Sequence, residues 1–228
     1  MNTELIRAVG RPRRIAPAAL VLTALQAQAA GGHHAVDDAS LLEPGECQLE
    51  TWADRTAGGT RSTMHLGPAC RLGAVELGLN LDRTRGAGAA STAGLQLKWA
   101  TPVSDTLSLG AVVSASWPAR LTSAPRRTGV LLATWEPAQA WRVHANAGRD
   151  FQPGAPSSTH AGAALEWQTT PAVSFVAERF REGGGDHGRV GARWALSTAI
   201  SVDLSRAAGW RGRAPAWWTV GLTWAGPR

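Results

Sequence analysis

The chain has 228 residues, a formal net charge of +6 and a hydrophobic fraction of 44%, so one large domain or two small ones would fit its length. No composition break after the first thirty residues divides it, and no later stretch approaches the roughly 20 apolar residues of a spanning helix. One domain is favoured, and helical membrane spans are excluded from the mature protein. Part of the basic charge lies in the first 29 residues, so it does not indicate nucleic acid binding.

Residues 1–29 have the layout of a cleaved export signal. Basic residues between Arg7 and Arg14 precede an apolar core, Ile15–Leu25, and an A-x-A cleavage site follows at residues 27–29. Arg13-Arg14 also fits a twin-arginine signal. We prefer the general secretory route, because the fold derived below must cross the inner membrane unfolded.

Residues 30–45 show neither a strand period nor a helix period, and we expect them to form a periplasmic lead-in that is either ordered or flexible. Cleavage after Ala30 would let Gly31-Gly32-His33 chelate Cu(II) or Ni(II) through nitrogen ligands. Cleavage after Ala29 fits the signal better and spoils that arrangement. We therefore expect His33 and His34 to be ordinary tail residues, with no metal site and no cofactor.

Residues 46–228 alternate with a period of two, which predicts strands. The runs are separated by Gly-rich, Pro-rich or charged segments. We predict about twelve strands, at residues 46–55, 61–70, 73–83, 91–101, 105–117, 127–136, 140–150, 159–168, 172–182, 187–196, 199–206 and 215–225.

The two cysteines, Cys47 and Cys70, form an even pair in an exported chain, which indicates a disulfide. With Gly58-Gly59 at the tip of the first hairpin, antiparallel pairing places the cysteines opposite each other. Closing a loop of this size contributes about 3–4 kcal/mol in the chain-entropy model.

Five tryptophans mark one end of the predicted sheet. Each closes an alternating run in the same phase, on the apolar face, and all but the last precede a short connection. An indole ring prefers the membrane interface, so we predict an all-β, transmembrane, antiparallel up-and-down β-barrel with an aromatic girdle. A soluble β-sandwich or a radial β-repeat is the alternative. The girdle residues are Trp99, Trp135, Trp167, Trp194 and Trp224.

Short and long connections alternate along the chain, as in barrels of the bacterial outer membrane with periplasmic turns and external loops. The last strand resembles the signal that the barrel assembly machinery reads. The long connections carry arginines that suit the phosphates of outer membrane lipid, including lipopolysaccharide. They are Arg83, Arg85, Arg120, Arg126, Arg127, Arg211 and Arg213. Ordinary solvated loops explain the same charges.

The polar face of the predicted strands turns inward and carries both signs of charge in similar number. We expect paired charges that partly fill the interior, and either a narrow or gated conduit for a small solute or a closed barrel. The predicted lumen residues are Glu76, Asp82, Lys98, Arg142, His144, Glu166, Glu178, Arg189, Arg193 and Asp203.

An enzyme is a less favoured alternative. His144 with Glu166 or Glu178, and a nucleophile such as Ser108 or Ser114, would resemble a lipase or deacylase of the outer membrane. No nucleophile lies in a recognisable motif, and we predict no catalytic residues. A non-conducting structural or surface-interaction barrel is the other alternative.

The lead-in and the first strand resemble the N-terminal signature of the family named for the MetA pathway of phenol degradation, which consists of outer membrane channel proteins. The residues that carry the resemblance are Asp37, Asp38, Ala39, Gly45 and Glu50. It implies passage of small compounds, hydrophobic ones included. The cysteine pair and the absence of tyrosine depart from the family.

Overall fold

The structure is a computed structural model that describes residues 33–119, 124–210 and 214–226. The export signal predicted at residues 1–29 lies outside these residues, as do Arg120, Arg211 and Arg213 of the long connections.

Twelve antiparallel strands form one closed barrel, in which each strand pairs with its chain neighbours and β1 pairs with β12. This confirms the predicted all-β, up-and-down barrel, and the predicted strand boundaries hold to within a few residues. The strands are β1 (Cys47–Thr56), β2 (Arg61–Leu72), β3 (Val75–Gly86), β4 (Ala90–Pro102), β5 (Leu107–Pro118), β6 (Arg126–Ala138), β7 (Trp141–Phe151), β8 (Ser158–Thr170), β9 (Val173–Glu182), β10 (Gly185–Ala195), β11 (Ile200–Gly209) and β12 (Trp217–Ala225).

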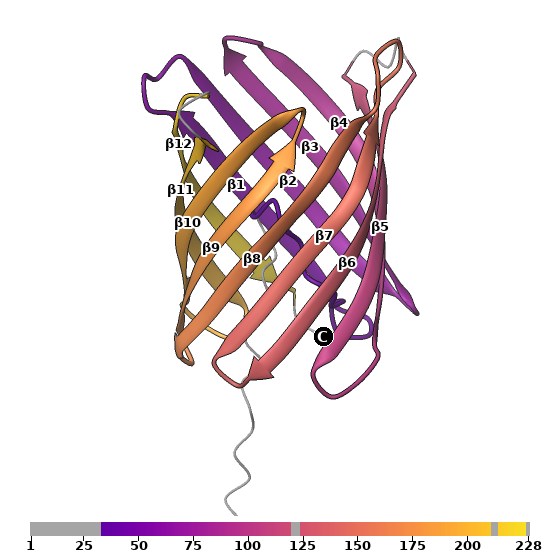
Figure 1. Ribbon diagram of the computed structural model, residues 1–228, viewed down its shortest axis with the longest axis vertical. Helices are drawn as coiled ribbons and strands as arrows, with labels where there is room; N and C mark the ends of the chain where they lie inside the picture. Colours follow the sequence, from indigo (N-terminus) through magenta and orange to yellow (C-terminus); the bar gives the residue numbers. More distant parts are fainter. Residues whose placement is uncertain (1–32, 120–123, 211–213, 227–228) are drawn as a thin grey trace, which may run out of the picture.

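The two ends of the barrel differ in their connections. Tight turns such as the one at Gly73, which adopts a positive φ of 63°, join β2 to β3, β4 to β5, and so on around one end. Figure 1 shows this short-turn end at the bottom. At the other end the connections after β5, β7 and β11 are the longest of the barrel, whereas those after β3 and β9 are as short as the turns, so the predicted alternation of short and long connections holds only in part.

The first hairpin has the predicted register. Cys47 pairs with Cys70 across β1 and β2, and the two form a disulfide with a Cα–Cα distance of 4.0 Å. The bridge joins these strands at the short-turn end of the barrel.

The outer face is apolar over the middle of the barrel. Leu131 and Val190 are more than 60% exposed, and the outward positions of neighbouring strands carry Leu, Val and Ala. A soluble sandwich would cover such a face with a second sheet, whereas a single closed sheet leaves it to hydrocarbon. Within the described ranges no helix has the length and hydrophobicity to cross a membrane.

The inner face is not empty. The segment from residue 33 to residue 45, named here the lumen segment, lies inside the barrel and not in the periplasm, where the sequence analysis placed it (Figure 1, indigo). Val36 and Ala39 of this segment are buried in two small apolar clusters with inward-facing wall residues. The segment lacks a period because it packs irregularly against several strands, so its position could not be read from alternation.

The two faces of β4 give a direct test of the barrel. Leu97 points outward and Gln96 inward, and they are adjacent in the chain. Leu97→Arg should lower the free energy of unfolding by about 2–4 kcal/mol near the bilayer midplane, because a guanidinium would enter hydrocarbon. Gln96→Arg should cost much less. Equilibrium unfolding by denaturant in lipid vesicles measures both, and equal losses would contradict the assigned faces.

Candidate functional site in the barrel lumen

All of the lumen residues named from the sequence face the barrel interior. His144, Glu166 and Asp203 are almost completely buried, whereas Asp82, Arg142 and Arg193 are half-buried. They project from seven strands, β3, β4 and β7–β11, because the period-two alternation turns every second side chain inward.

Charged side chains pair across neighbouring strands of the wall. Arg142 lies 3.3 Å from Glu166 between β7 and β8, and Arg189 lies 2.9 Å from Glu178 between β9 and β10. Arg193 donates to Asp203 across β10 and β11 at 2.7 Å. The expected pairing of opposite charges is therefore present on this side of the lumen.

The backbone of the lumen segment is held by side chains of the wall. The N–H groups of Val36, Ala39 and Leu42 donate to Glu178, Thr134 and Glu76 at 3.0, 2.8 and 3.2 Å. A buried irregular segment has no ladder partners, so such acceptors replace the hydrogen bonds to water that it loses. The contacts run from β3 through β6 to β9, so the segment crosses the lumen.

Lys98 of β4 is the charged anchor of the segment. Its ammonium lies 2.9 Å from Asp37 and 3.0 Å from Asp38, and the residue is 7% exposed. Asn146 of β7 exchanges two hydrogen bonds with the Asp37 backbone, one in each direction. Two of the MetA-like motif residues thus fix the segment to the wall.

The wall is shaped for the segment. Val36 is fully buried, and a Cβ added at Gly162 of β8 would lie 2.6 Å from its side chain. At Gly221 of β12 an added Cβ would lie 3.1 Å from Nδ1 of His33. Glycine at these two positions leaves the room that Val36 and His33 occupy.

The proposed acid–base pair is partly assembled, but inside the packed lumen. Nε2 of His144 lies 3.6 Å from Glu166, and Nδ1 lies 2.9 Å from the hydroxyl of Thr134, which also accepts from Ala39. The structure therefore brings together His144, Glu166 and Thr134, and places the lumen segment over them. This arrangement links wall and segment and leaves no open face for a substrate.

Three inward carboxylates of the wall were not predicted from the sequence: Glu50 and Asp54 of β1 and Asp150 of β7. Alternation along β1 and β7 could have found them, because each lies in phase with an inward-facing residue of the same strand. Among buried or half-buried interior groups, carboxylates outnumber basic side chains, contrary to the balance expected. The carboxylates include Asp37, Asp38, Glu50, Asp54, Glu76, Asp82, Asp150, Glu166, Glu178 and Asp203, and the basic side chains are Arg71, Lys98, Arg126, Arg142, Arg189 and Arg193.

Histidines are also concentrated inside. All six histidines of the chain lie on the inner face or in the lumen segment: His33, His34, His65, His144, His160 and His187. Burial lowers the pKa of His33, and the neighbouring His34, Arg189 and Arg193 lower it further. His33 and His34, expected to be tail residues, are thus interior groups.

The five tryptophans of the predicted girdle all point outward. They lie near the short turns, and each is 40–51% exposed. Trp167 stacks on Trp141 of the neighbouring strand at a centroid distance of 5.5 Å. Their placement at a membrane interface stays a prediction.

Charged residues on the outer face gather at the opposite, long-loop end. In the described strands the outward-facing charges there are arginines, with the exception of Asp186. We call these arginines, all exposed, the arginine belt: Arg55, Arg83, Arg85, Arg127, Arg149, Arg179, Arg181 and Arg206.

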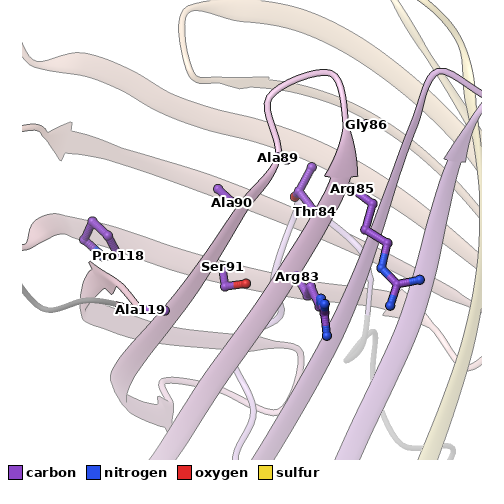
Figure 2. Close-up of a pocket in the computed structure, with 9 residues that line it drawn as sticks. All are labelled: Arg83, Thr84, Arg85, Gly86, Ala89, Ala90, Ser91, Pro118 and Ala119. Carbon is purple, nitrogen blue, oxygen red and sulfur yellow. The ribbon is translucent and has the colours of Figure 1, made fainter.

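A pocket of about 670 Å³ opens within the belt, between the ends of β3, β4 and β5. Figure 2 shows Arg83, Arg85 and Ser91 among its lining residues, with Pro118 and Ala119 on its other side. Two guanidinium groups and a hydroxyl beside small apolar residues suit a phosphorylated headgroup.

A family model described as "Uncharacterised conserved protein UCP029691" matches residues 18–225. No curated protein matches the chain in sequence. Neither comparison shows the MetA-pathway family that residues 37–39 resemble.

Several solved outer membrane barrels resemble the structure. The KdgM porin in complex with disordered oligogalacturonate has a TM-score of 0.67 at 8% identity, over 78% of this chain and 98% of that one. The NanC porin has a TM-score of 0.61 at 7% identity, over 77% of this chain and 98% of that one. The Acinetobacter baumannii outer membrane protein Omp33 has a TM-score of 0.50 at 10% identity, over 79% of this chain and 97% of that one. At these identities the likeness establishes a shared fold.

The Lys98 anchor can be tested by substitution. Lys98→Met leaves the buried Asp38 and the half-buried Asp37 without their cation, and loss of one partner of a buried ion pair typically costs about 3–5 kcal/mol. We expect the lumen segment to leave the wall and become cleavable by proteinase K, with the cut sites identified by mass spectrometry.

Two variants control this experiment. Adding Asp37→Asn and Asp38→Asn to Lys98→Met should restore protection, because the unpaired charges are gone. Arg126→Met breaks an ion pair with Asp150 that does not touch the segment, and should leave the segment protected. Cleavage in the Arg126 variant but not in the Lys98 variant would refute the anchor.

Proposed function

We propose that this chain, which belongs to the UCP029691 family of uncharacterised conserved proteins, is an outer membrane barrel that passes a small solute through a lumen closed by its own N-terminal segment. The carrying observation is how the lumen segment is held. Its hydrogen bonds and its Lys98 ion pairs are contacts that water can replace, while its buried apolar side chains among the described residues are the small Val36 and Ala39 and one larger residue, Leu42. Such a segment can be displaced without unfolding the barrel.

Three features support a place in the bacterial outer membrane. The apolar outer face suits hydrocarbon, the tryptophans suit the interface at the short-turn end, and the arginine belt suits the phosphates of an outer leaflet. If the arginine belt faces the outer leaflet, the short-turn end of the barrel, with both ends of the barrel sequence, faces the periplasm. The general secretory route and the barrel assembly machinery would deliver such a chain.

The interior charge narrows the solute class. A lumen in which carboxylates outnumber basic groups attracts cations and repels anions. KdgM is described in complex with oligogalacturonate, a polyanion, and this lumen is a poor match for such a ligand. A neutral or cationic small solute is the better fit. The polar wall also argues against the hydrophobic compounds that the MetA-like motif implied.

A second candidate is a barrel that does not conduct. It is favoured by the depth to which the segment fills the lumen, with Val36 and His144 completely buried. In that case the segment serves as a permanent core, and the barrel acts through its loops. The lipid-modifying enzyme has less support, because His144 is covered.

Conductance of the purified protein in planar bilayers separates the two candidates. Deleting residues 33–42 should raise the single-channel conductance several-fold over the full barrel, because the segment no longer fills the lumen. A salt gradient across the bilayer should then give a reversal potential of the sign that indicates cation preference.

The folded state is checked by the gel shift between boiled and unboiled samples. A folded deletion variant that conducts no better than the full barrel would remove the gating role of the segment. Absence of conductance in both would favour the second candidate, and anion preference would contradict the solute class.

The arginine belt predicts recognition of lipid phosphate. The double variant Arg83→Gln/Arg85→Gln should retain several-fold less bisphosphorylated lipid A after purification than the unchanged barrel, as measured by mass spectrometry. Arg61→Gln is the matched control, since Arg61 lies at the same end but on the inward phase. Equal loss with dephosphorylated lipid A would contradict phosphate recognition, and saturation by inorganic phosphate alone would show that no lipid is required.

A further inference from the structure

The first residues of the lumen segment belong to a cluster of metal-ligating groups. Neither the packing of the segment nor the proposed conduit explains this cluster. His33 and His34 of the segment and Asp203 of β11 each present one ligand atom, and these atoms lie within 4.8 Å of one another. His34 Nε2 is 4.0 Å from Oδ1 of Asp203, and His34 Nδ1 is 3.9 Å from Oε1 of Glu178. The centroids of the two imidazole rings lie 4.4 Å apart.

The donor atoms in this cluster are buried without partners. Neither ring nitrogen of His33 has a hydrogen bond, although the residue is only 6% exposed, and Nδ1 of His34 and Oδ2 of Asp203 also lack one. Buried polar groups are nearly always satisfied, and a set of orphaned donors and acceptors this close together indicates a ligand between them. Two charged groups of the neighbouring wall are paired, since Arg193 holds Oδ1 of Asp203 and Arg189 holds Glu178.

We infer that His33, His34 and Asp203 bind one divalent transition-metal ion of the zinc class. Two imidazole nitrogens and a carboxylate oxygen are a zinc-type donor set, and hard cations such as Mg²⁺ prefer sites made of oxygen alone. The ligand atoms must rotate inward to reach the metal–ligand distance of about 2.0–2.2 Å. Glu178 stands beside His34 as a fourth oxygen donor or as a partner that orients its ring.

The surrounding structure fixes these ligands in place. Arg189 donates to the backbone carbonyl of His33, and the absence of a Cβ at Gly221 leaves space for the His33 ring. Asp203 is 1% exposed and is held at its other oxygen by Arg193. Glu178 and Asp203 pair with the two arginines near the site, Arg189 and Arg193. The ion would tie the lumen segment to β11 at residues 33 and 34, a few residues before the Lys98 anchor at Asp37 and Asp38.

Zinc binding to untagged mature protein, purified from outer membranes and stripped with EDTA, tests the site. Isothermal titration with ZnCl₂ should give one ion per chain, and excess Mg²⁺ should not compete. His33→Ala, His34→Ala and Asp203→Asn should each weaken zinc binding at least tenfold, while His160→Ala, which removes an inward histidine outside the cluster, should not. Zinc should also raise the temperature at which the unboiled band disappears on gels.

The variants remain informative whatever their folding. A boiled/unboiled gel shift selects folded protein, and Co²⁺ absorption in the visible range reports histidine and carboxylate ligation in the unchanged chain. The site is refuted if His34→Ala and Asp203→Asn bind zinc like His160→Ala. Loss in His33→Ala alone would identify a chelate of the mature N-terminus, which uses neither His34 nor Asp203, and would overturn the proposal as well.

Discussion

Closure of the sheet is the constraint on which the rest of this structure depends. Once β12 pairs with β1, every strand has hydrogen-bonded neighbours on both sides, and each side chain must point either out or in. Over the middle of the barrel most outward positions carry Leu, Val or Ala, and all of the carboxylates named above except Asp186 are on the inward phase or in the lumen segment. The apolar phase requires lipid, and the polar phase requires either water or partners inside the barrel.

Twelve strands enclose more space than wall side chains alone fill, since barrels of about eight strands are the size at which side chains meet across the interior. Here the chain fills part of that space with its own N-terminal segment. The wall contributes what an irregular backbone lacks: acceptors from Glu76, Thr134 and Glu178, and a cation, Lys98, between two aspartates. Glycines at 162 and 221 leave matching space. Wall and segment are complementary in shape and charge.

Alternation was sufficient to predict the strands, the outward tryptophans and the inward charges, because a strand has a fixed period that a single sequence reveals. It also contained the position of Glu50 and Asp54, whose phase on β1 follows from the apolar Leu49. It held no information on residues 33–45, since an irregular segment has no period. The place of His33 depends on Arg189 and Gly221, which are distant in sequence and adjacent only after the barrel closes.

The segment is bound more weakly than a core of equal length would be. A hydrophobic plug loses its burial energy when it moves, and water offers no replacement. The aspartates, Lys98 and the backbone N–H groups of this segment would instead regain hydration as they separate, which offsets much of the lost attraction. What resists opening is therefore the burial of Val36, Ala39 and Leu42, together with any ion that His33 and His34 share with Asp203. A metal ion ligated by His33 and His34 of the segment and by Asp203 of the wall would add a strong contact between segment and wall. The fraction of chains that hold the ion would then set how firmly the lumen is closed.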